Sequence, residues 1–147
     1  MVVRRAQPDD IPWLVRELCA FAAHYPVQIP VPHDHAERLL GQLIDTQYVA
    51  IASTEDGTRV GLIAGVLQPH PFAPDVMCAT QLWWWVTPDH RSSSAGARLL
   101  GDFEQWAAST GADLTSFTIA ANSPIHADSM LRRGWRPAEM VYVRGLS

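Results

Sequence analysis

Residues 83–100, WWWVTPDHRSSSAGARLL, decide the fold of this chain. An apolar run ends at Pro88 and a turn of small residues follows. Apolar residues then recur at helical spacing and predict the packed face of a helix, at Leu99, Leu100, Phe103, Trp106 and Ala107. This order predicts a buried strand, a turn and a helix in direct succession. The first N–H groups of a helix have no partner inside it, and the helix dipole is positive at that end. The segment therefore predicts an anion site where the strand meets the helix.

The composition is that of one ordinary globular domain. The chain has 147 residues, of which 48% are hydrophobic and 18% charged. A net charge of −4 argues against a broad nucleic-acid surface, so nucleic acid is not an expected partner. Charged residues interrupt the apolar stretch 11–27, so membrane insertion is not expected either. The two cysteines predict reduced thiols, and a cytoplasmic location is expected.

The hydrophobic periodicity predicts alternating strands and helices. Strands are expected over 2–6, 47–53, 59–67, 76–87, 113–120 and 138–144. Helices are expected over 11–24, 33–44 and 94–110, with a short one from a cap at Asn122 or Ser123 to Arg133. Proline-rich loops are expected over 25–32 and 68–75. The prediction is an α/β (α+β) fold, a mixed central sheet of about six to seven strands with helices on both faces.

The strand-to-helix junction carries a recognisable pattern. It reads Val86-x-Pro88-x-x-Arg91, then Ser94-x-Gly96, then two leucines. This pattern resembles the acyl-CoA signature of the GNAT superfamily of N-acyltransferases, with Ser94 where the family has its first glycine. The order of elements is also similar over most of the chain. The resemblance implies a single GNAT-like domain over residues 1–147, with a sheet that is splayed at the cofactor site.

The resemblance implies acetyl-CoA as the cofactor, and the turn fits a pyrophosphate physically. Small side chains let phosphate oxygens approach the backbone N–H groups, and serine hydroxyls and an arginine add donors. The expected cofactor-binding residues are Trp85, Val86, Thr87, Arg91, Ser92, Ser93, Ser94, Ala95, Gly96, Ala97 and Asn122. A nucleotide P-loop is excluded because its lysine is absent from the whole chain.

The catalytic residues depart from the family pattern. An alkyl amine costs about 4–5 kcal/mol to deprotonate near pH 7, so a positioned base helps. Where many members of the family carry a glutamate base, this chain has Thr80 or Gln81, and Met130 stands at the position of the tyrosine acid. The candidate catalytic residues are therefore Gln81 and His126. The alternative proton carriers are Asp128, Ser129, His70 and Asp75.

The sequence thus predicts an acyl-CoA-dependent N-acetyltransferase that moves an acetyl group to an amine by direct attack on the thioester. One alternative is a catalytically weak CoA-binding module that acts as a sensor or partner. Another is a macromolecular acceptor, either a protein amine or an amino-modified nucleobase. A small-molecule or peptide amine is the expected partner, and the protein is expected as a monomer or homodimer. No metal site is expected, because His33 and His35 have no third ligand nearby in the sequence.

Overall fold

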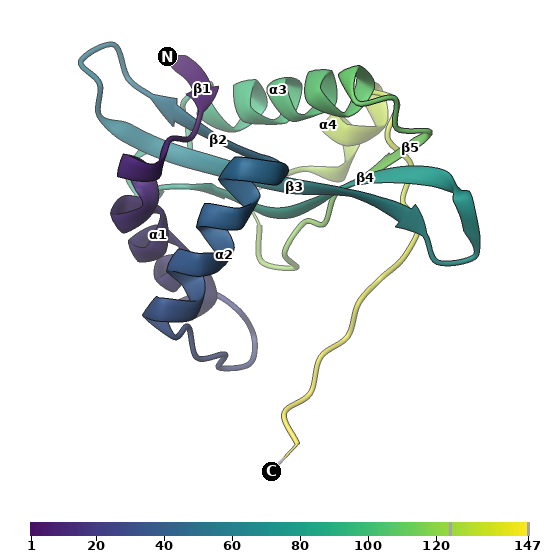
Figure 1. Ribbon diagram of the computed structural model, residues 1–147, viewed down its shortest axis with the longest axis horizontal. Helices are drawn as coiled ribbons and strands as arrows, with labels where there is room; N and C mark the ends of the chain where they lie inside the picture. The colour runs from purple at the N-terminus through teal and green to yellow at the C-terminus, as the bar shows by residue number, and fades with distance from the viewer. Residues whose placement is uncertain (124, 147) are drawn as a thin grey trace.

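The computed structural model describes residues 1–123 and 125–146, and Figure 1 shows their arrangement. In chain order the elements are β1 (Val2–Arg5), the 3-10 turn η1 (Pro8–Asp10), α1 (Ile11–Ala23), α2 (His33–Thr46), β2 (Tyr48–Ser53), β3 (Arg59–His70), β4 (Ala73–Val86), the 3-10 turn η2 (Pro88–His90), α3 (Ala95–Ser109), β5 (Leu114–Ser116) and α4 (Ala127–Arg132).

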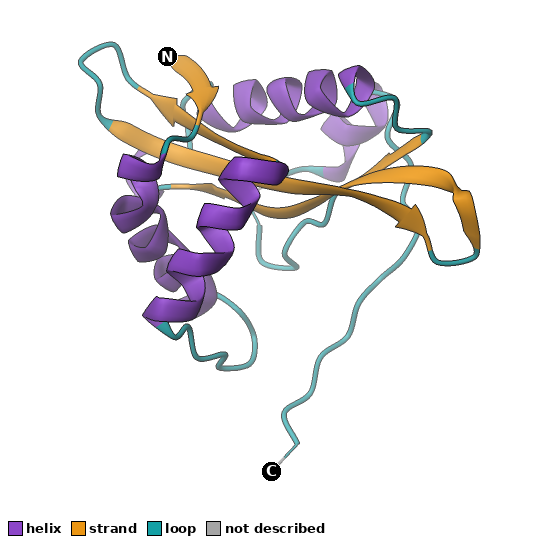
Figure 2. Cartoon of the chain, in the orientation of Figure 1, coloured by secondary structure: helices purple, strands orange, loops and turns teal. Residues whose placement is uncertain are grey.

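One mixed sheet runs through the molecule in the order β1-β2-β3-β4-β5. The first four strands are antiparallel to their neighbours, and β5 is parallel to β4. Helices α1 and α2 cover one face, and α3 covers the other, with α4 beside it (Figure 2). The predicted mixed sheet with helices on both faces is confirmed.

Two apolar cores result from this layering. One lies under α1 and α2 and includes Leu14, Leu40 and Trp85. The other lies under α3 and includes Phe103 and Tyr48. Since both faces of β2 are covered, residues 48–52 are buried without alternation, as expected of a central strand.

The number of strands was predicted wrongly. The described residues form five strands rather than six or seven. The last expected strand, 138–144, has no pairing partner and runs away from the body of the molecule (Figure 1), where Tyr142 is 85% exposed. The expected strand 113–120 is also shortened to Leu114–Ser116. Alternating apolar residues suit a sheet, but a strand forms only where a neighbouring strand offers its edge.

Two local predictions also need correction. Residues 68–75 are not a long loop, because β3 continues to His70 and β4 begins at Ala73. The prolines are accommodated at the end of this hairpin, where a ladder irregularity follows Pro69. The cap of α4 is His126 rather than Asn122 or Ser123, so the helix is shorter than predicted.

An ion cluster around one buried carboxylate joins the start of the chain to β3. The carboxylate of Asp10, which is 1% exposed, accepts bonds from Arg4 at 2.7 and 2.9 Å and from Arg59 at 2.8 Å. It also accepts the Gln7 backbone N–H at 2.8 Å. Chiefly because the Arg4 guanidinium donates to it, the pKa of Asp10 is lowered from 3.8 to about 2.

Asp10→Asn is expected to lower the free energy of unfolding by about 2 kcal/mol near pH 7. A depressed carboxyl pKa stabilises the fold above the unfolded value of 3.8, and that contribution is lost as the pH falls through about 2. The measurement is urea denaturation of both proteins near pH 7 and near pH 3. The matched control is Asp9→Asn, at an exposed neighbour. Equal loss in the two variants would contradict the role of the cluster.

Candidate functional site

A cavity of about 960 Å³ opens where the sheet loses a pairing. Its walls come from the second half of β4, the segment after β5, the start of α3, and α4. The end of α1, the connection that follows it and the first turns of α2 close the remaining side. The cavity therefore touches the segment that the sequence marks as an anion site.

The opening is a splay between β4 and β5. The two strands pair at three positions, of which Thr80 opposite Ser116 is the last. At the next position the side chain of Gln81 replaces the ladder, since its Oε1 accepts the Thr118 backbone N–H at 2.8 Å. Gln81 is 6% exposed. From this residue to Val86, β4 has no strand partner on its β5 side among the described residues.

A β-bulge lies at the same place. Ala64 pairs with Trp83 and Gly65 pairs with Gln81, so Leu82 is an extra residue in β4. Leu82 lines the cavity. A bulge breaks the ladder locally, which makes backbone groups available to a ligand. The bulge carries no composition signal, and for this reason sequence analysis did not identify Leu82.

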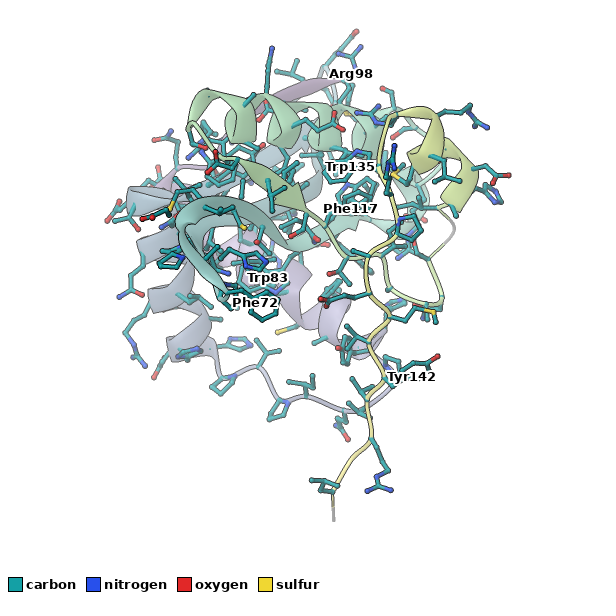
Figure 3. The ribbon with its side chains drawn as sticks, turned by 90° about the vertical axis from the view of Figure 1, so that its right-hand side faces the viewer. Phe72, Trp83, Arg98, Phe117, Trp135 and Tyr142 are labelled. Atoms are coloured by element: carbon teal, nitrogen blue, oxygen red, sulfur yellow. The ribbon has the colours of Figure 1, made fainter. Side chains whose placement is uncertain are left out.

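The tryptophans lie on the two faces of β4. Trp83 and Trp85 pack toward α1 and α2, whereas Trp84 packs toward α3, because successive side chains of a strand point to opposite faces. Trp84 meets Phe117 edge-on, with ring centroids 6.0 Å apart. Phe117 in turn meets Trp135, with ring centroids 4.4 Å apart (Figure 3). Within the described part of the chain, Trp84 Nε1 is the one buried side-chain polar atom without a hydrogen-bond partner.

The turn between β4 and α3 is held by its own polar groups. Arg91 Nε donates to the Val86 carbonyl at 3.2 Å, and its guanidinium lies 4.7 Å from the centre of the Trp85 ring. Ser93 Oγ accepts the Ala95 N–H at 3.2 Å. Ser94 has φ −76°, so serine is unstrained at the position where the family has a glycine.

The structure brings most of the expected cofactor residues to the cavity. Those that line it are Trp85, Val86, Arg91, Ser93, Gly96, Ala97 and Asn122. Four others, Thr87, Ser92, Ser94 and Ala95, do not. The Thr87 hydroxyl instead contacts the Val60 carbonyl at 3.2 Å, and Ala95 is fully buried.

The candidate catalytic residues also fall into two groups, those that line the cavity and those that do not. Gln81 and His126 line the cavity, as does Ser129. Gln81 presents its Oε1 to the Thr118 N–H, so its structural role is to hold the splay. His70, Asp75 and Asp128 are not lining residues, and His70 lies in the β3–β4 hairpin, where Nδ1 accepts the Phe72 N–H at 3.1 Å.

The residues present fit a phosphate-bearing thioester cofactor. The apolar walls suit an extended aliphatic arm, while Gly96 and Ala97 leave backbone approachable at the start of α3. The unpartnered indole N–H of Trp84 belongs to a ring whose Cζ2 edge lies beside Gly96. A buried donor without a partner is where a ligand acceptor is expected.

The described residues show neither a metal site nor a membrane-spanning helix. Within residues 1–123 and 125–146, His, Cys, Asp and Glu side chains form no group of three or more that could hold a metal ion. Among the helices described, each is too short or too polar to span a bilayer.

The fold, with its opened sheet, is similar to that of several solved acetyltransferase structures. An acetyltransferase from Trypanosoma brucei is 15% identical, with 99% of each chain covered and a TM-score of 0.74. A predicted acetyltransferase from Clostridium acetobutylicum, solved with acetyl-CoA, is 11% identical, with 97% of this chain and 95% of that chain covered and a TM-score of 0.77. A ribosomal-protein-alanine N-acetyltransferase from Brucella melitensis is 17% identical over 99% and 98% of the two chains, with a TM-score of 0.72.

The sequence itself matches the model of the acetyltransferase (GNAT) family over residues 14–134. This chain belongs to the GNAT acetyltransferase family, as the resemblance predicted. No curated protein is a significant match to it.

Proposed function

We propose that this protein is an N-acetyltransferase that moves the acetyl group of acetyl-CoA to an amine. The observation that carries the proposal is a single cavity that joins the β4–β5 opening to the start of α3. Such a cavity can hold the pyrophosphate at one end and the thioester in the sheet opening. Family membership supports the same cofactor.

Gly96, Ala97 and Ser93 would hold the pyrophosphate at the start of α3, with Arg91 supplying charge. Val86 and Trp85 would line the pantetheine arm, and Asn122 would lie near its far end. Asn122 Nδ2 donates to the His24 carbonyl at 3.3 Å, which links this wall to the end of α1. When bound, acetyl-CoA supplies an activated acetyl thioester.

The chain would orient the amine and handle protons and charge. The amine nitrogen attacks the thioester carbon, a C–N bond forms, the C–S bond breaks, and the thiol takes up the proton that the amine loses. Backbone N–H groups around the Leu82 bulge are the proposed donors to the developing oxyanion. His126 is the proposed proton carrier, because its imidazole lines the cavity. Proximity would supply much of the rate.

Calorimetry with acetyl-CoA tests the cofactor, and thiol release in the presence of amines tests turnover. Saturable binding of acetyl-CoA and amine-dependent release of thiol are expected. If neither acetyl-CoA nor CoA binds, the proposed function is wrong.

A second candidate is a CoA-binding module with weak catalysis. It is favoured by the cavity wall itself, where Met130 and Gln81 offer neither an acid nor a base. Tight binding of acetyl-CoA without amine-dependent thiol release would support this candidate. The acceptor is proposed as a small molecule or peptide, with a macromolecular amine as the alternative. The protein is further proposed to be cytoplasmic, as a monomer or homodimer.

Gln81→Met is expected to reduce amine-dependent thiol release about tenfold and the free energy of unfolding by about 1–2 kcal/mol. Methionine keeps the length of the side chain but leaves the Thr118 N–H without its acceptor, so the opening changes shape. Gln81→Glu keeps an acceptor oxygen and is expected to recover most of the activity. Thiol-release kinetics and urea denaturation of both variants provide the measurement. If Gln81→Met retains full activity, or if Gln81→Glu loses as much activity as Gln81→Met, the acceptor oxygen of Gln81 does not position the site.

A further inference from the structure

We propose that the acceptor is an apolar amine that is uncharged near neutral pH, with an arylamine as the fitting class. This inference rests on the acetyl-transfer function proposed above. It concerns the part of the cavity that α1, α2 and their connection enclose. Phe21, Tyr25, Ile29, Val31, Leu39 and Trp83 line that part of the cavity.

The ionisable groups on the cavity wall are all imidazoles or guanidiniums, apart from the phenol of Tyr25. Three are the histidines His24, His35 and His126, and the others are Arg91 and Arg133. Among the described residues that line the cavity, none carries a carboxylate. A wall without a carboxylate offers an ammonium group no ion-pair partner, whereas a neutral amine needs none.

Two carboxylates lie close behind the wall, and both are engaged elsewhere. Glu17 accepts the Trp85 indole N–H at 2.8 Å. Glu104 accepts Arg133 at 2.6 Å and the Trp135 indole N–H at 2.8 Å. The exposed Asp128 of α4 does not line the cavity. Neither Glu17 nor Glu104 is among the residues that line the cavity, and each is held by the contacts above.

The most buried aromatic ring of the wall already has cationic and aromatic neighbours. Arg91 lies 4.7 Å from the centre of the Trp85 ring, and His24 meets that ring edge-on at 5.0 Å. Phe21 meets it edge-on as well, at 6.1 Å. The Trp85 ring is thus already enclosed by side chains, which fits its proposed place on the pantetheine side of the cavity rather than in the acceptor part.

An acceptor that is uncharged near pH 7 also explains why the described residues of the cavity wall include no carboxylate base. Near pH 7 only about one alkylamine molecule in 2,500 is neutral, so the reaction needs a base or a high pH. An arylamine is already neutral at that pH, because its lone pair is delocalised into the ring. Its nitrogen can attack the thioester carbon directly, and the N–H proton then passes, through water or an imidazole, to the departing thiolate. Its ring also gains from burial among Phe21, Tyr25 and Trp83.

The test compares aniline with cyclohexylamine, which match in size but differ in charge near pH 7. Thiol release from acetyl-CoA by the full chain is expected to have a kcat/KM at least about tenfold higher for aniline. The rate with aniline should change little between about pH 7 and 9, whereas that with cyclohexylamine should rise about tenfold per pH unit. A preference for cyclohexylamine or for the diamine cadaverine near pH 7 overturns the inference.

A variant of the cavity wall provides a second measurement. His35→Glu places a carboxylate in the first turns of α2, where negative charge suits the helix dipole and the fold is expected to persist. It should lower KM for cyclohexylamine about tenfold relative to aniline, because a carboxylate attracts the ammonium. The uncharged control His35→Gln should leave that ratio unchanged. Equal shifts in the two variants contradict the argument from charge.

Failure of the inference can be distinguished from failure of the proposed function. If acetyl-CoA does not bind, acetyl transfer is wrong and the inference falls with it. If acetyl-CoA binds and cyclohexylamine is acetylated as well as aniline, only the acceptor class is wrong. If acetyl-CoA binds but no amine releases thiol, calorimetry of the two amines against the CoA complex decides. Tighter binding of aniline supports the inference, and equal or reversed affinities overturn it.

Discussion

Gly96→Glu is expected to weaken acetyl-CoA binding by about a hundredfold or more while the protein remains folded. Gly96 lies in the first turn of α3 and lines the cavity where the pyrophosphate is proposed to bind. A carboxylate there occupies the phosphate volume and satisfies the positive end of the helix dipole in its place. Isothermal titration calorimetry with acetyl-CoA provides the measurement, with circular dichroism to verify the fold.

The matched control is Gly96→Ala. A Cβ at this position would lie 3.7 Å from Trp84 Cζ2 and from Val86 Cγ2, which is ordinary van der Waals contact. Alanine should therefore bind acetyl-CoA within about threefold of the natural protein, and it should favour the helix slightly. If the glutamate variant also binds normally, the pyrophosphate does not lie at the start of α3.

Gly65→Ala is expected to lower the free energy of unfolding by about 3 kcal/mol. A Cβ at Gly65 would lie 2.7 Å from Phe103 Cε2 and 3.2 Å from the Thr80 carbonyl. Phe103 is fully buried and packs at a tilt against both Tyr48 and Trp106, so it has little room to move. Urea denaturation of the two proteins measures the difference.

Gly101→Ala is the control for the Gly65 prediction and should have the opposite sign. Gly101 lies inside α3, and a Cβ there would meet no atom within 4 Å. Alanine should raise the free energy of unfolding by about 1 kcal/mol, because glycine is a poor helix former. If Gly65→Ala loses no stability, crowding by Phe103 does not constrain that position. If Gly101→Ala also loses stability, a loss at Gly65 cannot be assigned to that crowding.

Sequence reasoning succeeded where one residue pattern dictates one local structure. The leucines of residues 99–100 with Phe103 and Ala107 predicted the buried face of α3, and these side chains are buried. The turn between the predicted strands 47–53 and 59–67 contains Gly57, and its φ of +85° is one that glycine adopts readily. Periodicity failed at residues 138–144, because pairing depends on a partner edge that the pattern does not encode.

The candidate site shows the same division. The place of Gly96 and Arg91 at the cavity could be predicted because a small-residue turn before a helix suits the binding of an anion. The bulge at Leu82 and the bond from Thr118 to Gln81 could not, since both depend on registers between strands distant in the sequence. The same holds for the sites of Glu17 and Glu104 behind the wall, which were set by packing of α1 and α3 on the sheet.

The sequence by itself determined the order of elements, the two faces of β4 and the small-residue turn after it. These follow from local periodicity, side-chain size and helix-end polarity, which act over a few residues. Only the tertiary structure decided where the sheet opens, which groups face the cavity and that no carboxylate of the described residues lines it. Those properties arise when α1, α2 and α3 pack on opposite faces of one sheet, because packing brings together residues that are far apart in the chain.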